Sequence, residues 1–279
     1  MLDSSIIKKI EDFVYAKPRS VQEIAQHIEK NWRTADRYID EIEKNFGTIS
    51  IRVFREGTRG ALKIVYWSSI EKVSSSVFQE ALEENIFNKI RREDFSTFDI
   101  FQHVDNKNKK VLVKKGENES KLGTLNEFSD LLKQTKKQII FFSGNLSFIN
   151  FEDGKVNIFK VLEELVKKGI FIKVISRVDL AGIENVRKLL SLNFKYGKEL
   201  IEIRHREQPL RVTIIDNGII NLKEIKKPTG RESELKEKTF IFYTIKDKAW
   251  IEWLTRIFWK MFNSSIGADK RLQELKHLI

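Results

Sequence analysis

The first third of the chain shows three helical patterns of hydrophobic positions. Apolar side chains recur at helical spacing over residues 4–14, 21–28 and about 32–45. Ser20 and Glu23 have the spacing of a capping box, which predicts that the second helix begins at this point. A short polar turn separates the second and third helices. The order of the three segments predicts a helix-turn-helix.

Two β patterns follow these helices. Residues 49–54 and 61–67 are rich in β-branched and aromatic side chains, and 55–60 is a glycine-containing connection. A hairpin directly after a helix-turn-helix is typical of a winged helix, so we predict a winged helix-turn-helix DNA-binding domain over 1–68. The residues predicted to contact DNA are Arg19, Ser20, Lys30, Arg33, Thr34, Arg37, Arg55 and Arg59.

The third helix is the expected recognition helix. Arg33, Thr34 and Arg37 lie off its apolar stripe, near its N-terminal end. Arginine can pair bidentately with guanine, and threonine can reach a phosphate or a thymine methyl group. The alternative is that these are solvated charges, because acidic residues on the same helix offset the bases and some winged helices bind only protein.

The segment 69–123 is predicted to be a helical connector with a charged loop. Residues 69–92 have a helical pattern, and such a helix either pairs two subunits or packs on its own chain. Residues 95–101 are apolar but short. Residues 105–120 are charged and predict an exposed loop or hairpin, whose lysines either contact phosphate or are simply solvated.

From residue 124 helical and β patterns alternate, which predicts an α/β domain over 124–279 and a multi-domain α/β protein overall. The expected helices are 125–137, 156–168, 182–194 and 247–262, and the expected strands are 138–142, 170–176, 201–206, 210–215, 219–225 and 240–245. The last helix is strongly aromatic, which favours a core or dimer surface over a ligand site.

Composition limits the choice of function. The 279 residues carry a formal net charge of +11, which favours a polyanionic partner. The chain has no cysteine, which excludes disulfides and thiol chemistry. The chain contains no stretch of 18 uncharged apolar residues, so no membrane span is expected. The apolar run at the N-terminus contains acidic residues, which is unlike a signal peptide. A cytoplasmic protein with no membrane association is therefore expected.

One short segment of the C-terminal domain resembles a catalytic signature. Residues 209–216 have the spacing of the His-x-Lys-x4-Asp signature of the phospholipase D superfamily, with Arg211 in the lysine position and Asp216 in the acid position. Pro209 stands in the histidine position. Because proline has no nucleophile and His205 is four residues too early, we expect a phospholipase D-like fold without catalytic residues.

A winged helix, a connecting helix and a degenerate phospholipase D-like domain together resemble the TrmB family of archaeal transcriptional regulators. The resemblance implies a dimer that binds promoter DNA; several members sense sugars, and others coat DNA as chromatin-like proteins. It also implies an effector site at the strand ends of the C-terminal domain. The expected effector-binding residues are Ser143, Asn145, Ser176, Arg204, Arg211 and Asp216.

Other chemistry is not indicated. The four histidines have no metal-ligand spacing, and no glycine-rich phosphate loop is present, so neither a metal nor a cofactor is expected. We therefore expect a homodimeric, sequence-specific regulator that binds double-stranded DNA and is not an enzyme, with a C-terminal domain that senses a small-molecule effector, dimerises, or does both. The alternatives are a phospholipase D-type nuclease with a winged-helix targeting module and a non-specific architectural chromatin protein.

Overall fold

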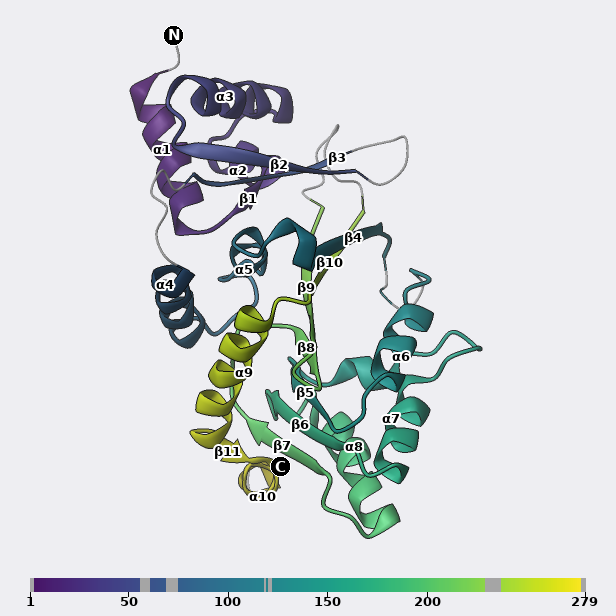
Figure 1. Ribbon diagram of the computed structural model, residues 1–279. Helices are drawn as coiled ribbons and strands as arrows, with labels where there is room; N and C mark the ends of the chain where they lie inside the picture. Colours follow the sequence, from purple (N-terminus) through teal and green to yellow (C-terminus); the bar gives the residue numbers. More distant parts are fainter. Residues whose placement is uncertain are drawn as a thin grey trace.

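The computed structural model describes residues 3–55, 61–68, 75–117, 119, 122–228 and 237–276. Figure 1 shows an N-terminal unit of three helices and a small sheet, stacked on one end of a larger α/β unit. We call the part up to residue 68 the N-terminal unit and the remainder the C-terminal unit. The predicted connection at 56–60 and the first part of the predicted connector helix, 69–74, lie outside the described residues.

The N-terminal unit has the elements expected of a winged helix-turn-helix. They are α1 (Ser4–Ala16), β1 (Arg19–Ser20), α2 (Val21–His27), α3 (Trp32–Asn45), β2 (Ile49–Arg55) and β3 (Ala61–Trp67). The capping box that starts α2 is present, because the Ser20 hydroxyl accepts from the Glu23 amide and a Glu23 carboxylate oxygen accepts from the Ser20 amide. The strands form an antiparallel sheet in the order β1-β3-β2.

The predicted connector is joined to the C-terminal unit by a strand. It contains α4 (Ser75–Asn88), α5 (Phe98–Gln102), the short η1 (Asn106–Asn108) and β4 (Lys109–Lys115). Part of the predicted charged loop at 105–120 is therefore a strand, which pairs with β10 at the edge of the large sheet. Its valines alternate with other residues, and Val113 is buried, so the strand is held by burial despite its lysines. The described part of this segment thus contributes a strand to the sheet of the unit that follows it.

The C-terminal unit is built on an eight-stranded mixed sheet in the order β11-β7-β6-β5-β8-β9-β10-β4. Its other strands are β5 (Gln138–Phe142), β6 (Phe171–Ser176), β7 (Ile201–His205), β8 (Val212–Ile215), β9 (Ile219–Lys226), β10 (Thr239–Ile245) and β11 (Ile266–Gly267). Its other helical elements are α6 (Leu125–Lys133), η3 (Ser147–Asn150), α7 (Ile158–Lys167), α8 (Ile183–Tyr196), α9 (Lys248–Asn263) and α10 (Ala268–Lys276). Strands β5, β6 and β7 are parallel, and every other pairing is antiparallel.

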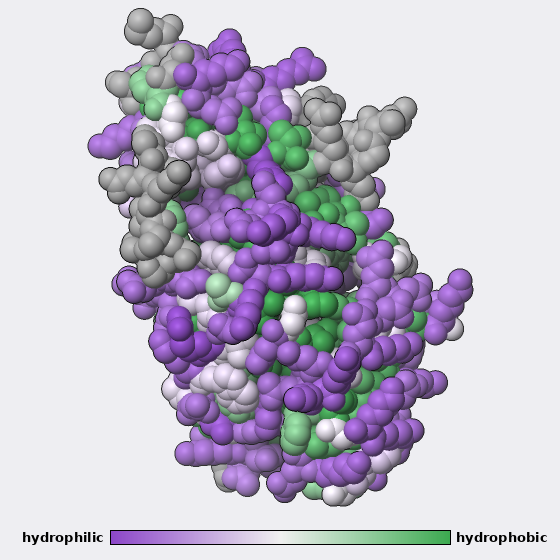
Figure 2. Space-filling view, in the orientation of Figure 1, coloured by the Kyte–Doolittle hydropathy of each residue, from purple (hydrophilic) through white to green (hydrophobic). Residues whose placement is uncertain are grey.

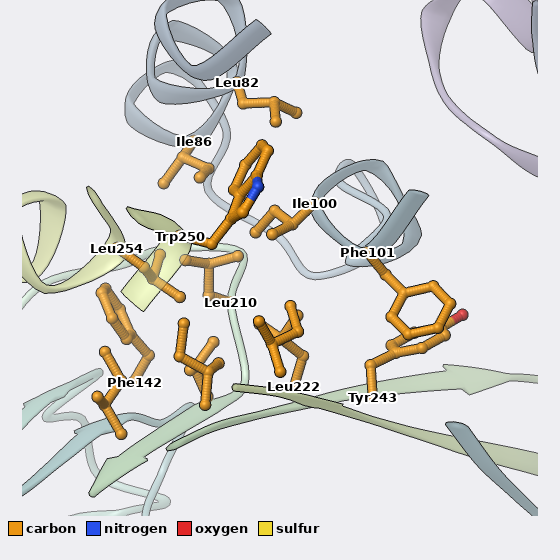
Figure 3. Close-up of a cluster of buried hydrophobic side chains, with 14 of the residues drawn as sticks. Leu82, Ile86, Ile100, Phe101, Phe142, Leu210, Leu222, Tyr243, Trp250 and Leu254 are labelled. Atoms are coloured by element: carbon orange, nitrogen blue, oxygen red, sulfur yellow. The ribbon is translucent and has the colours of Figure 1, made fainter. Parts of the chain in front are cut away.

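Helices cover the two faces of the sheet unequally. Helices α6, α7, α8 and α10 share a core with one face of β5, β6 and β7. Helices α4, α5 and α9 share a second core with the opposite face, which extends across β8, β9, β10 and β4 (Figure 3). The aromatic stripe of α9 belongs to this second core, with Trp253 and Phe258 almost fully buried, as the sequence favoured.

The hairpin of the N-terminal unit also belongs to the second core. Phe54 on β2 lies 6.1 Å from Phe98 of α5 and 6.3 Å from Tyr243 of β10, measured between ring centroids. Leu62 and Ile64 on β3 are buried in the same cluster. One face of the hairpin therefore anchors the N-terminal unit on the large sheet by apolar packing.

A buried ion pair adds to this anchor. The Lys226 ammonium at the end of β9 lies 3.1 Å from a Glu23 oxygen of α2 and 3.1 Å from a Glu224 oxygen. Burial raises the pKa of Glu23, but Lys226 and the two hydrogen bonds from Ser20 outweigh it and bring that pKa to about 2. Burial lowers the pKa of Lys226, and the two carboxylates raise it above its ordinary value. Glu23 and Lys226 are therefore both ionised at neutral pH.

Removing this ammonium group should destabilise the protein. Lys226→Met leaves two carboxylates near each other without their shared cation, and we expect a loss of about 3 kcal/mol, as for other broken buried pairs. The neighbouring Lys227→Met is the control, because Lys227 is exposed and its contact with Glu93 is 3.8 Å long, so its loss should stay below about 1 kcal/mol. Urea denaturation followed by tryptophan fluorescence measures both, and equal midpoints for the two variants would contradict the anchoring role.

Candidate functional site

The outer surface of α3 presents the predicted recognition residues. Arg33 and Arg37 are exposed and Thr34 is partly exposed, whereas Ala35 and Ile39 are buried against the N-terminal core. Helix α3 lies at the end of the molecule farthest from the C-terminal unit (Figure 1). Figure 2 shows hydrophilic side chains over this end. The protein's own C-terminal half does not cover these arginines.

Local contacts fix the orientation of α3. The Asn31 side chain accepts a hydrogen bond from the Thr34 amide at 2.8 Å, which caps the helix. The Lys63 ammonium on β3 lies 2.7 Å from an Asp36 oxygen, so one of the acidic groups of α3 is already paired. This pairing ties α3 to the hairpin and reduces the negative charge beside the arginines.

The other predicted DNA contacts are placed differently. Arg19 lies with its guanidinium 3.7 Å from the Phe13 ring centroid and donates to the Phe13 carbonyl. Ser20 is buried in the capping box. Lys30 lies in the turn before α3, Arg55 ends β2, and Arg59 lies outside the described residues. The structure thus gathers Arg33, Thr34 and Arg37 on α3, and it commits Arg19 and Ser20 to internal contacts.

One lysine of the predicted charged loop makes hydrogen bonds within the protein. Lys109 donates to the carbonyls of Phe101 and Gln102 at 2.9 and 3.1 Å. Burial, and then the nearby Arg52, lower the pKa of Lys109 to about 8. This lysine supports α5 against β4, so it is not placed for contact with phosphate.

A large cleft lies between the N-terminal unit and the C-terminal unit. Its volume is about 1670 Å³, and its floor is the face of β8, β9, β10 and β4 that is turned away from α9. Floor residues include Thr213, Asn221 and Phe242, and the rim includes Lys17 and Gln26 from the N-terminal unit. Figure 2 shows hydrophobic patches at this level, between the hydrophilic N-terminal end and the hydrophilic side chains over α6 and α7.

Three of the predicted effector residues meet at one end of this cleft. Ser143 and Asn145 follow β5, Arg211 precedes β8, and all three line the cleft. The Ser143 hydroxyl accepts from the Leu146 amide, and the Asn145 carbonyl accepts from the Asn185 side chain. The Arg211 guanidinium donates to the Leu210 carbonyl at 2.7 Å and lies against Gly144.

The other three predicted effector residues do not join this group. Ser176 is fully buried and donates to the Gly144 carbonyl at 3.1 Å. Arg204 pairs with Glu202 and donates to the Phe262 carbonyl, at the β11 side of the sheet. Asp216 lies at the opposite end of β5, because it follows β8, which runs antiparallel to β5.

Two arginines that the sequence analysis did not select line the cleft beside Arg211. Arg177 directly follows β6, and Arg92 lies in the loop after α4. Burial first, and then the charges of Arg92 and Arg177, lower the pKa of Arg211 to about 10. The position of Arg177 after a strand could have been read from the sequence, whereas nothing in the sequence points to Arg92.

The residues that the structure describes include neither a membrane-spanning helix nor a metal-binding group of side chains. None of the helices there is long and apolar enough to cross a membrane. No group of three or more histidine, aspartate or glutamate side chains is placed to hold a metal ion in that part of the chain.

Three solved structures show a distant likeness to this chain. No protein-family model and no curated protein matches this chain. Nuc from Salmonella typhimurium, a phospholipase D family member, is 14% identical over 57% of this chain and 97% of its own, with a TM-score of 0.40. TrmBL2, an archaeal chromatin protein with a novel mode of DNA binding, is 16% identical over 94% and 93%, with a TM-score of 0.39. Phosphatidylserine synthase from Haemophilus influenzae Rd KW20 is 12% identical over 81% and 63%, with a TM-score of 0.40. At these scores the likenesses say nothing of this chain's activity.

The role of Asp216 can be tested through stability. Its carboxylate accepts three backbone hydrogen bonds, from Lys136, Lys137 and Gln138, at 2.6 to 2.9 Å. Asp216→Asn keeps a residue that tolerates the positive φ of this turn but removes the charge, so we expect a loss of about 1–2 kcal/mol. Urea denaturation measures it. An unchanged midpoint would show that these hydrogen bonds do not hold the start of β5.

Proposed function

We propose that this protein is a transcriptional regulator that binds double-stranded DNA sequence-specifically as a homodimer in the cytoplasm. The observation that carries the proposal is the exposed pair Arg33 and Arg37 on α3, at the end of the molecule that the C-terminal unit leaves open. Two outward guanidiniums on the second helix of a helix-turn-helix have the chemistry for reading the major groove. The net charge of +11 favours the same partner.

In this proposal α3 enters the major groove. Arg33 and Arg37 lie four positions apart, on one face of the helix, so both can point into the groove. Each can make two hydrogen bonds to a guanine edge, and Thr34 lies close enough on the same turn to contact a phosphate. The connection at 55–60 is the proposed contact with the DNA backbone.

The C-terminal unit is proposed to be catalytically inactive. Pro209, in place of a nucleophilic histidine, is buried and offers no atom that can attack phosphorus. Asp216 is bound to three backbone amides at the other end of β5, away from Arg211. Arg211 and Asp216 therefore lie at opposite ends of β8.

Regulation is proposed to act through the cleft between the units. Lys17 and Gln26 of the N-terminal unit line the same cleft as Arg211, so both units contribute to the wall of this cleft. An effector alters DNA binding only if it prefers one arrangement of the units over the other. The C-terminal unit is then the effector-sensing or dimerising part of the regulator.

The DNA contact is tested by Arg37→Ala. If Arg37 reads a base, we expect duplex binding to weaken by about 1–3 kcal/mol on an operator selected from random duplex DNA. Fluorescence anisotropy measures the affinity. The control is Arg256→Ala, an exposed arginine on α9 in the C-terminal unit, which should bind like the unchanged protein. An affinity of Arg37→Ala equal to that of the unchanged protein would remove Arg37 from the interface.

Two further measurements separate the rival functions. Duplex affinity should fall steeply between about 50 and 200 mM salt, because phosphate contacts release counterions. A flat salt titration would count against DNA as the partner. A footprint that spreads with protein concentration over any sequence would instead favour a chromatin protein, and plasmid nicking that Arg211→Ala abolishes would favour a nuclease.

A further inference from the structure

The excess positive charge of this protein lies outside the winged helix. Residues 1–68 hold 12 lysines and arginines against 10 aspartates and glutamates, so they contribute +2 to the net charge of +11. Residues 69–123 are neutral, with 10 groups of each sign. The α/β part, 124–279, therefore carries +9. A charge of this size favours a polyanionic partner for the C-terminal unit itself.

Six exposed lysines gather where three helices of this unit lead into the sheet. The connections from α6 to β5, α7 to β6 and α8 to β7 lie at one edge of the sheet, because these three strands are parallel. The Phe171 amide donates to the Lys137 carbonyl at 3.0 Å, which joins the first two connections. The Lys198 ammonium donates to the Lys167 carbonyl at 3.3 Å, which joins the second and third. We call the six exposed side chains the lysine rim: Lys133, Lys136, Lys137, Lys167, Lys168 and Lys198.

The rim lysines have no acidic partner in the described part of the chain, where none of them forms an ion pair. Two neighbouring acids are already occupied. Asp216 accepts three backbone hydrogen bonds, and Glu163 accepts from Lys195 and from the Tyr196 hydroxyl. Glu199 is the one acid within the three connections, and it is exposed. The rim therefore keeps a positive charge that the protein does not neutralise.

The helix ends account for only part of this charge. Lysine is favoured in the last turn of a helix, because the final carbonyls carry a partial negative charge. Lys133 and Lys167 occupy such positions on α6 and α7. Lys136, Lys137 and Lys198 lie past the ends of their helices, so the helix dipole does not explain their placement.

The rim forms a row that suits a DNA duplex. Helices α6, α7 and α8 pack side by side in that order. Packed helices lie about 8–10 Å apart, so the row of their ends is about 20 Å long. Duplex DNA carries one charge per about 1.7 Å of its axis, so about twelve phosphates lie along that length. Ammonium groups on flexible stems can contact these phosphates without reading bases.

The rim lies away from the proposed recognition helix. Helix α8 and its connection to β7 are at the end of the molecule opposite α3 (Figure 1). None of the rim lysines lines the large cleft, which lies at the other end of β5 and β6. A duplex on the rim and a duplex on α3 therefore do not compete for the same surface.

We propose that the lysine rim binds the phosphate backbone of duplex DNA, independently of its sequence, so that one molecule holds two DNA segments at once. The rim contact goes beyond the function proposed above, because it needs neither α3 nor an operator. Holding two segments rests on that function, since the first segment is the one bound by α3.

Rim binding is tested in a protein without the arginines of α3, Arg33→Ala with Arg37→Ala. Fluorescence anisotropy should show that this protein still binds an arbitrary duplex of about 30 base pairs at about 50 mM salt. Adding Lys136→Gln, Lys137→Gln and Lys168→Gln, together the rim variant, should weaken binding at least about tenfold. The slope of log affinity against log salt should fall by about 2–3, because each lost phosphate contact removes about 0.9. An unchanged affinity and slope would overturn the rim.

Matched variants separate the position of the charge from its amount. The control variant removes the same charge from exposed lysines away from the rim, and it should weaken binding less than about threefold. Its substitutions are Lys155→Gln, Lys160→Gln and Lys227→Gln. Arginine at the three altered rim positions keeps the charge and should retain the original affinity. Because all these side chains are exposed, thermal unfolding of each variant should stay within about 2 °C of the unchanged protein. Equal losses in the rim and control variants would refute a localised site.

The two-segment contact has a separate readout. Beads that carry the selected operator should retain a second, labelled duplex of arbitrary sequence when the unchanged protein is present. With α3 intact, the rim variant should still bind the operator but retain at least about tenfold less of the second duplex. Equal retention by both proteins would refute the rim as the second contact. Tighter binding of the protein without the α3 arginines to phosphatidylserine vesicles than to duplex would overturn DNA as the partner of the rim. If Arg37→Ala leaves operator binding unchanged while the rim variant loses duplex binding, the role of Arg37 fails and the rim remains.

Discussion

A buried ammonium group lies at the junction of the two units of this protein. Lys226 ends β9 and lies between Glu224 of its own strand and Glu23 of α2. Glu23 is also the residue that closes the capping box at Ser20, so the start of α2 and the end of β9 form one hydrogen-bonded assembly. The contact of the hairpin with Phe98 and Tyr243 supplies the apolar part of the same junction. The orientation of α3 follows from this junction, because α3 is tied to the hairpin through Lys63.

Strand β9 connects the cleft to this junction. Successive residues of β9 face opposite sides of the sheet, so Asn221 and Lys223 face the cleft while Leu222 faces the second core. The strand that ends in Lys226 thus also forms part of the cleft floor. A ligand that shifts β9 would act directly on the carboxylate that begins α2.

The sequence predicted the local features well and the long-range ones poorly. The capping box at Ser20, the helix 32–45 and the hairpin strands depend on neighbouring residues, and their patterns are strong. The predicted loop at 105–120 contains β4, because pairing with β10, more than a hundred residues away, decides its structure. Asp216 and Arg204 are expected beside Arg211 because each of them lies near the end of a predicted strand. The antiparallel direction of β8 places Asp216 at the wrong end of the sheet, and spacing along the chain does not reveal that direction.

The two faces of β8 and β9 have different roles. On β8 and β9 the residues that face α9, such as Ile214 and Ile220, are fixed by dense packing. Their neighbours Thr213 and Asn221 face the cleft instead. Selection could therefore exchange the chemistry of one side of these strands while the other side keeps the domain folded. Relatives of this protein could diverge in what they recognise without any change of architecture.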